Sequence, residues 1–335
     1  MNSQYSQPYR ELIQLLLDSP PGIEAQIIQK HSNLLNPKLF QLIKETANQQ
    51  QEPKKSQQLQ GIAFSIKGMI TERFNMYIQG LWLTSESNEN PQVVYPFLQN
   101  HVHLLDQVLL DVFRAFQSQY LAGENSDNAQ AMAEITCRFS YLIQEFSLGN
   151  RAINIDIAIA GYQVSLEAIT PTIYPHFWAL IQLNLGAAYQ MRLRGEKADN
   201  LEKAIVAYEQ ALLIFSQEDK LPIEWAMVQG NLGDVYEARI KGEKADNLEK
   251  AISAYEQALK IYTHRAYPNE RAIHQSYLGR AYAERICGKR VDNLTQAIEL
   301  YEQALKTLNP RDYPQYRESI QDNLSILRTV ISTYE

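Results

Sequence analysis

The chain repeats one stretch of sequence three times at a nearly constant interval. Residues 195–205, Gly-Glu-Lys-Ala-Asp-Asn-Leu-Glu-Lys-Ala-Ile, return unchanged as residues 242–252 and in a looser form as residues 288–298. The intervals are 242 − 195 = 47 and 288 − 242 = 46 residues. A fixed period of this size is typical of stacked repeats, in which each unit buries its apolar face against a neighbour. The period therefore predicts an elongated stack rather than a single compact core.

Each unit contains two segments in which small and apolar residues are three or four positions apart, the spacing of one helix face. In the first unit these segments are residues 184–189, Asn-Leu-Gly-x-x-Tyr, and residues 204–212, Ala-x-x-x-Tyr-x-x-Ala-Leu. Glycines stand where the first helix should end, and prolines stand where it should begin. These residues are Gly195, Gly242, Gly288, Pro175, Pro222, Pro268 and Pro314. The pattern predicts one helical hairpin per unit, with Asp199 and Asp246 as the N-caps of two second helices.

The two-helix pattern resembles the tetratricopeptide repeat, whose usual period is about 34 residues. The extra length here lies in the connections, since 204 − 186 = 18 residues separate the small residues of the two helices. The resemblance implies an all-α fold, namely a right-handed α-solenoid of helical hairpins with a period of 46–47 residues, preceded by an N-terminal helical region. An arginine also recurs near the end of each first helix, and we expect it to pair with a repeated glutamate. The predicted pairing sets are Arg192, Arg239 and Arg285 with Glu209, Glu256 and Glu302.

The rest of the sequence also has helical spacing and divides the chain into three parts. We predict an N-terminal helical subdomain over residues 1–50, a helical region over residues 51–128, and repeats with a C-terminal capping helix over residues 129–335. Gly149 lies 46 residues before Gly195, which places a degenerate first repeat near residue 129. The predicted helices before that point are Gln7–Asp18, Ile23–Leu35, Lys38–Asn48, Gly61–Thr84, Gln92–Gln99 and His101–Leu121, and the polar stretch Gln49–Gln60 is the predicted linker.

Charge and hydropathy exclude some classes of partner. The chain carries 31 basic and 38 acidic side chains, a net charge of −7, and no basic tract longer than Lys54-Lys55. Nucleic acid is not an expected partner because binding its phosphates requires a clustered positive face. No apolar run has membrane-spanning length, and the start of the chain lacks the parts of a signal peptide. We therefore expect a cytoplasmic protein without membrane contact.

No residue pattern typical of catalysis, metal binding or cofactor binding is present. His101 and His103 lie two positions apart on an expected helix and point in different directions, so they cannot share a metal ion. The only cysteines, Cys137 and Cys287, exclude a disulfide framework. We expect a protein that is not an enzyme and that binds no metal and no cofactor. The alternative is a cryptic hydrolase that uses one of the cysteines, although no third orienting group stands at a recognisable spacing.

The remaining candidate surface is the concave side of the array, which the first helices should line. Two positions there differ between otherwise similar repeats, and ligand discrimination is expected at such positions. The candidate binding residues are Asn184, Asn231, Asp234, Tyr277, Arg280 and Asn323. An asparagine amide offers a donor and an acceptor to a peptide unit, and its place resembles that of the ligand-gripping asparagine in peptide-binding tetratricopeptide proteins, including the kinesin light chain type. The alternative is that each asparagine hydrogen-bonds a neighbouring helix.

The layout of the whole chain, with Arg-Gly-Glu-Lys-Ala-Asp-Asn units after a helical N-terminal part, resembles the non-catalytic half of cyanobacterial tetratricopeptide proteins that carry a CHAT (caspase-like) domain. The resemblance implies a scaffold without the protease half. The expected function is a non-enzymatic adaptor that binds a protein or peptide in the concave groove. The alternatives are a stand-alone regulatory subunit of a split CHAT protease system and a self-assembling structural protein.

Overall fold

A computed structural model of the chain describes residues 7–20, 23–31, 34, 37–114, 126–215 and 221–334. Every regular element in these ranges is helical, so the all-α prediction is confirmed. The chain forms two compact units, Met1–Thr170 and Pro171–Glu335, and each is described by itself. In the ranges above, no helix is both long enough and apolar enough to cross a bilayer. The three-part division of the sequence stays a prediction.

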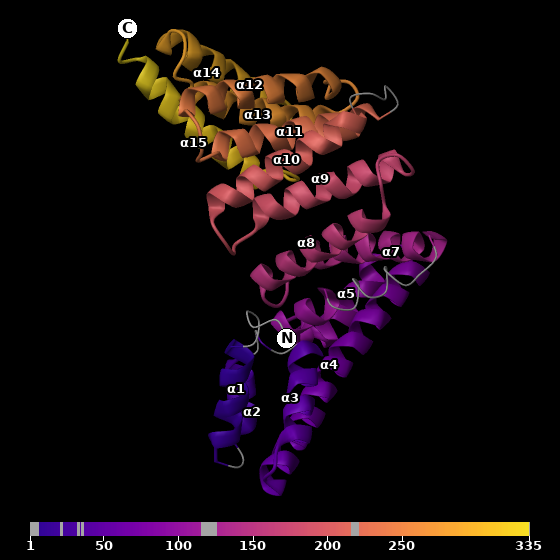
Figure 1. Cartoon of the computed structure of the whole chain (residues 1–335). Helices are drawn as coiled ribbons and strands as arrows, with labels where there is room; N and C mark the ends of the chain where they lie inside the picture. Colours follow the sequence, from indigo (N-terminus) through magenta and orange to yellow (C-terminus); the bar gives the residue numbers. More distant parts are fainter. Residues whose placement is uncertain are drawn as a thin grey trace. The chain divides into compact units, whose positions relative to one another are not determined.

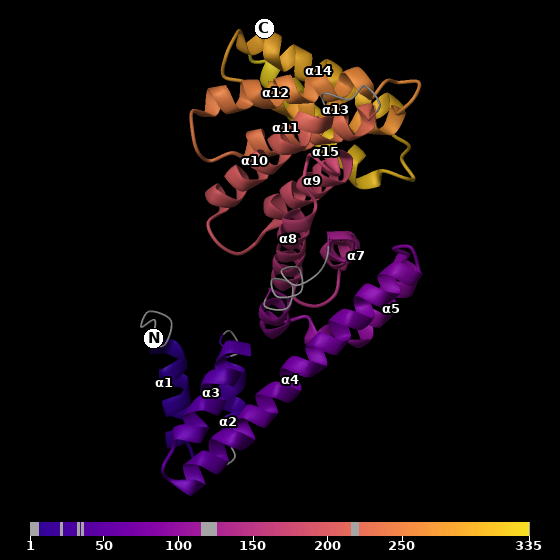
Figure 2. The same cartoon turned by 45° about the vertical axis from the view of Figure 1, so that its right-hand side comes forward.

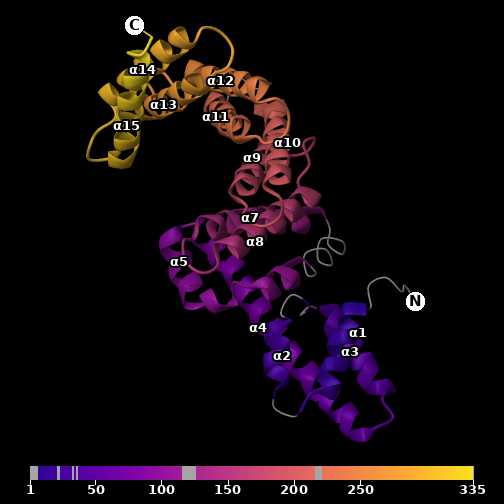
Figure 3. The ribbon, with the colours of Figure 1, turned by 90° about the vertical axis from the view of Figure 1, so that its left-hand side faces the viewer.

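The second unit is a row of helical hairpins, as predicted (Figure 1). Its first helices are α9 (Pro175–Met191), α11 (Pro222–Ala238), α13 (Pro268–Glu284) and α15 (Pro314–Ile331), and its second helices are α10 (Lys197–Phe215), α12 (Lys244–Ile261) and α14 (Arg290–Thr307). Each first helix begins at its proline, as predicted, because the missing N–H of proline has no helical partner in the first turn anyway. In Figure 3 these helices form an arc, with the first helices on its inner side and the second helices on its outer side.

The connection inside each hairpin is closed by a glycine and a buried asparagine. Gly195, Gly242 and Gly288 have φ angles of +78°, +81° and +82°, the left-handed conformation that the sequence predicts for them. One turn inside each second helix, an asparagine amide donates to the loop carbonyl six residues earlier, at 2.8–3.0 Å. These asparagines are Asn200, Asn247 and Asn293.

The predicted N-caps are wrong, because the second helices begin before the two aspartates. Asp246 lies inside the first turn of α12, whose N-cap is Glu243 without a side-chain hydrogen bond. Asp199 likewise lies in the first turn of α10 and binds Lys241 at 2.7 Å.

A buried tyrosine of each second helix packs on a glycine of the first helix of the same hairpin. Tyr208, Tyr255 and Tyr301 are at most 2% exposed. A Cβ atom added at Gly186 would lie 2.6 Å from the Tyr208 ring, which is too close for any larger residue. The glycine therefore sets the close approach of the two helices, as expected for small residues in a helix contact.

Ion pairs join neighbouring hairpins, but Arg239 and Arg285 do not bind the predicted glutamates. Arg239 binds Glu202 of the preceding hairpin through two hydrogen bonds of 2.8 Å. Arg285 binds Glu249 in the same way at 2.7 and 2.8 Å. The predicted partner Glu209 instead accepts a hydrogen bond from Tyr236 at 3.1 Å. The reason is that adjacent helices run antiparallel, so the end of a first helix lies beside the beginning of the preceding second helix.

The first unit is built along the long helix α4 (Pro53–Glu86), shown in Figure 2. The helices α1 (Gln7–Asp18), α2 (Glu24–Lys30) and α3 (Pro37–Gln49) share an apolar cluster with its N-terminal half. The predicted linker Gln49–Gln60 is wrong, since residues 53–60 form the first turns of α4 and Leu59 is fully buried. Pro53 starts this helix instead of interrupting the chain, and the partners of Leu59 come from helices remote in sequence.

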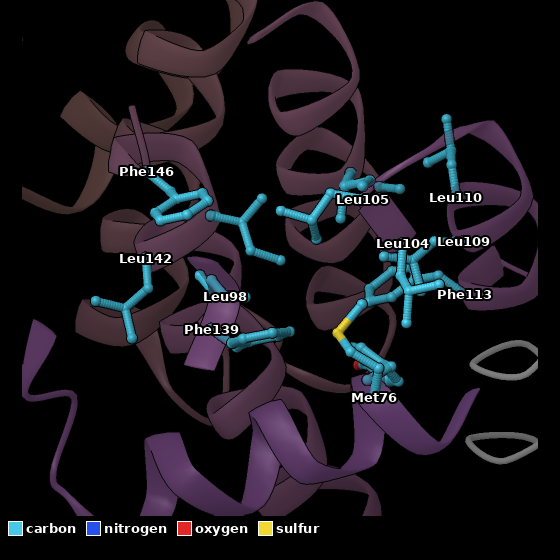
Figure 4. Packing of buried hydrophobic residues seen from close by; sticks show 14 of the residues in the cluster. Met76, Leu98, Leu104, Leu105, Leu109, Leu110, Phe113, Phe139, Leu142 and Phe146 are labelled. Atoms are coloured by element: carbon cyan, nitrogen blue, oxygen red, sulfur yellow. The ribbon is translucent and has the colours of Figure 1, made fainter. Parts of the chain in front are cut away.

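The C-terminal half of α4 packs in a second cluster, shown in Figure 4. The other contributors are α5 (Pro91–Asn100), the short 3-10 turn η2 (Val102–Leu104), a helical segment over residues 107–114, α7 (Ser126–Glu145) and α8 (Arg151–Ala168). The predicted helix His101–Leu121 is therefore interrupted at its start, and residues 115–121 lie outside the described residues.

The hairpin of α7 and α8 is closed in the same way as the hairpins of the second unit. Gly149 has a φ of +81°, and Asn154 donates to the carbonyl of Leu148 at 2.9 Å. The predicted degenerate repeat near residue 129 thus has the loop geometry of a repeat, although α8 carries apolar residues where the later second helices begin with charged ones.

Candidate functional site

The inner side of the arc in the second unit exposes one stripe of residues from each first helix. We call these four rows of residues together the inner face. It comprises Phe177, Leu180, Asn184, Ala187 and Met191 of α9, Glu224, Met227, Asn231, Asp234 and Ala238 of α11, Glu270, Ile273, Tyr277, Arg280 and Glu284 of α13, and Tyr316, Ser319, Asn323, Ile326 and Val330 of α15. All of these residues are exposed or half-exposed, whereas residues on the opposite side of the same helices are buried. All six residues predicted from the sequence belong to this face.

The inner face is hollowed between α13 and α15. A pocket of about 340 Å³ lies there, lined by side chains of both helices and by Tyr301 of α14. It brings together three predicted residues, Tyr277, Arg280 and Asn323. The hydroxyl groups of Tyr277 and Tyr316 are 3.2 Å apart. The pocket thus presents aromatic rings, an amide and a guanidinium group on a surface built from two adjacent hairpins.

Arg280 is held in a network that reaches the neighbouring helix α11. Its guanidinium group donates to both carboxylate oxygens of Glu237, at 2.5 and 3.0 Å, and lies 3.8 Å from Asp234. It also stacks over the Tyr277 ring at 5.2 Å. The hydroxyl of Tyr255 lies 2.7 Å from Asp234 and 3.0 Å from Glu237. Three predicted residues, Asp234, Tyr277 and Arg280, therefore belong to one network.

Burial shifts the protonation of two groups at this network. The pKa of Asp234 is raised by its removal from water, although the Tyr255 hydrogen bond and the Arg280 charge lower it. The pKa of His274 is lowered by burial, against the raising effects of the Glu270 carbonyl and the Asp234 charge. The hydrogen bond to Glu237 raises the pKa of Arg280, which keeps the guanidinium group charged. The network therefore holds a fixed positive charge beside the carboxyl groups of Glu237 and Asp234.

The asparagines make contacts that the sequence left as an alternative. Burial raises the pKa of Tyr208 in the preceding hairpin, and the side chain of Asn231 acts in the opposite direction. Burial likewise raises the pKa of Tyr301 to about 12, and the side chain of Asn323 is among the groups that lower it. Each amide has further donor and acceptor positions, so a contact with a neighbouring helix leaves part of its hydrogen-bonding capacity. Asn184 lies half-exposed on α9 and is not part of the pocket.

Sequence reasoning missed several residues of this surface. Glu237 holds Arg280, and Tyr301 and Tyr316 line the pocket. The sequence signal for Glu237 is its register, since it lies 47 residues after Gln190 and occupies the equivalent position of the next hairpin. Gln190 accepts a hydrogen bond from Tyr208 at 3.1 Å, so this position faces the repeated tyrosine. The rings of the repeated tyrosines Tyr208, Tyr255 and Tyr301 are in the core. Their helical spacing does not indicate that the hydroxyl groups of Tyr208 and Tyr255 reach polar side chains of the first helices.

The two cysteines differ in their surroundings. Cys137 is buried, and desolvation raises the pKa of its thiol to about 12, which disfavours the thiolate that a nucleophile requires. Cys287 is exposed on the connection before α14. Within the part of the chain that the structure describes, no cluster of three or more His, Cys, Asp or Glu side chains is arranged to hold a metal ion.

One protein family is similar to the repeats. The family model of soluble NSF attachment protein, SNAP, matches residues 182–317, from α9 to α15. The match lies wholly within the second unit and includes most of the inner face. No curated protein matches the chain.

Proposed function

We propose that this protein is a non-enzymatic adaptor that binds a protein or peptide on the inner face of its second unit. The single observation that carries the proposal is the pocket between α13 and α15, which joins aromatic, amide and charged side chains on an exposed concave surface. Such a combination is typical of surfaces that orient a ligand by a few polar groups among apolar ones. Asn184, Asn231, Asp234, Tyr277, Arg280 and Asn323 are the proposed contact residues.

The similarity to the SNAP family supports this type of function. The name of that family describes proteins that attach to another protein, NSF, and its match covers the hairpins that form the inner face. For the present chain we propose that it binds a protein partner in the cytoplasm. The similarity to the SNAP family does not identify that partner. The tetratricopeptide-like sequence pattern supports the same type of function, because stacked helical repeats provide extended concave binding surfaces.

Site-specific photo-crosslinking in cells tests the proposal. A photo-reactive amino acid at Met227 or Ile326, which are 44% and 60% exposed on the inner face, is expected to form an adduct with a partner. The same amino acid at Ser253 or Glu299, exposed positions on the outer helices α12 and α14, is the matched control. The double variant Asn231→Ala with Asp234→Ala is expected to remove the adduct formed at Ile326. Adducts from the outer positions alone would refute binding on the inner face.

The resemblance to the non-catalytic half of CHAT proteins motivates a narrower form of the proposal, in which the partner is a separately encoded caspase-like domain. Co-expression with such a domain is the direct test. A stable complex that the double variant disrupts would support the split system. Failure of every such domain to bind would leave the adaptor proposal standing and remove this form of it.

A further inference from the structure

We propose that the inner face takes a basic, amphipathic segment of a partner protein, in which lysine or arginine side chains alternate with aliphatic ones. The inference rests on the proposed function and specifies the chemistry of the partner. It follows from the charges of the inner face and from the apolar side chains between them.

Acidic side chains outnumber basic ones on the inner face. Glu224 and Glu270 occupy equivalent positions in the first turns of α11 and α13, and no side chain among the described residues is bonded to either carboxylate. Their charges add to that of Asp234, which lies farther along α11 on the same face. A helix N-terminus tolerates such acids by itself, so position in the first turn alone does not point to a ligand.

The only cation of the inner face, among the residues that define it, is already engaged. Arg280 serves both Glu237 and Asp234, so one guanidinium group faces two carboxylates. The Arg280 and Tyr255 contacts of Asp234 are both made through Oδ1, and no described residue donates to its Oδ2. Glu284 binds Lys244 at 3.0 Å, at the edge of the arc. Glu224, Asp234 and Glu270 therefore leave a surplus of negative charge that a cationic partner would complement.

Aliphatic side chains lie between these acids. Met227 follows Glu224 by one helical turn and is 44% exposed, and Ile273 follows Glu270 in the same way. Leu180 continues this row on α9. Exposed aliphatic groups in register on adjacent helices favour contact with apolar side chains of a ligand. A basic and aliphatic segment can pair with the acids and pack on the aliphatic groups at the same time, whereas an acidic segment would be repelled at α11 and α13.

Selection of peptides by the full chain tests this chemistry. A random 12-residue display library would be selected on the immobilised protein, and the enriched peptides would be synthesised and titrated by fluorescence anisotropy. We expect enrichment of lysine and arginine together with aliphatic residues. The double variant Glu224→Gln with Glu270→Gln is expected to weaken binding by about fivefold to tenfold, and added salt is expected to weaken binding to the unaltered protein.

The matched control is Glu299→Gln, which removes the same charge from the outer helix α14 and should leave the affinity unchanged. Enriched peptides that are neutral or acidic, yet lose affinity with Asn231→Ala, would overturn the basic-segment inference and leave the proposed function intact. A selection that yields no peptide dependent on the inner face, together with no adduct at Ile326, would overturn both.

Discussion

One tyrosine position shows how a core residue that recurs in three successive hairpins has different polar neighbours in each. Tyr208, Tyr255 and Tyr301 are buried in equivalent places of successive hairpins. The hydroxyl of Tyr208 donates to Gln190, and that of Tyr255 lies within hydrogen-bonding distance of two carboxylates, Asp234 and Glu237. The packing of the ring is fixed by the hairpin, whereas the partner of the hydroxyl depends on the residues of the first helices. Variation between repeats is thus concentrated at the polar end of a constant core.

A histidine replaces an aliphatic residue at one packing position and should make stability depend on pH. His274 stands in register with the buried residues Ile181, Val228 and Ile320. It packs against Gly230 of α11 and lies 4.8 Å from the Tyr262 ring of the preceding second helix. The ring nitrogen Nδ1 is 2.8 Å from the carbonyl of Glu270. Burial lowers its pKa below the usual value of 6.5, despite the nearby Asp234 charge.

We predict that His274→Gln flattens the pH dependence of stability. Because the pKa of His274 is lower in the folded state, its stabilising effect is present above pH 6.5 and is lost as pH falls through the folded pKa. For a single group the slope cannot exceed about 1.4 kcal/mol per pH unit. Urea denaturation between neutral and mildly acidic pH would measure it. His264→Gln, at an exposed loop position, is the control, and equal slopes for His274→Gln and the unaltered protein would contradict the assignment.

At the scale of elements, hairpins are joined by contacts between helices that are adjacent in the chain. A bidentate arginine–glutamate pair connects α11 to α10, and another connects α13 to α12. Sequence register located the arginines but not their partners, because the end of a first helix could face any glutamate of the neighbouring helix. The antiparallel order of the helices selects the glutamate one turn into the second helix.

A double-mutant cycle would distinguish the two pairings. We expect a coupling energy of about 1 kcal/mol between Arg239→Met and Glu202→Gln, since the pair is bidentate and its side chains are 21% and 29% exposed. The coupling between Arg239→Met and Glu209→Gln should be close to zero, because Glu209 contacts Tyr236. Chemical denaturation of the single and double variants provides both values. A larger coupling with Glu209 would contradict the observed arrangement.

At the scale of the whole molecule, the two compact units build their interiors differently. In the first unit, helices distant in sequence gather along α4, so its core depends on long-range contacts. In the second unit, the clusters join helices of the same or successive hairpins. The helix α15 ends this series with a polar surface. Its residues Glu318, Gln321 and Ser325 stand in register with the buried Ala272, Gln275 and Gly279 of α13.

This polar surface predicts that α15 does not drive self-association, which sequence analysis left as an alternative. The chain should therefore elute as a monomer at high concentration in size-exclusion chromatography with light scattering. Glu318→Ala with Gln321→Leu, which creates an apolar patch on α15, should increase the measured mass with concentration. The control is Glu299→Ala with Thr295→Leu, at two exposed positions on the outer helix α14. Concentration-dependent oligomers of the unaltered chain that the variant does not enhance would contradict the prediction.

The sequence by itself determined the hairpins, because their signals are local. Proline fits the first turn of α9, α11, α13 and α15, glycine adopts the positive φ that closes each loop, and the period places these signals in register. The helical period also indicated the six candidate residues that lie on the inner face. Only the tertiary structure decided that residues 53–60 continue α4 and that Arg280 binds Glu237. These outcomes depend on which helices become neighbours and how each is rotated, and such long-range contacts leave no local pattern in the chain.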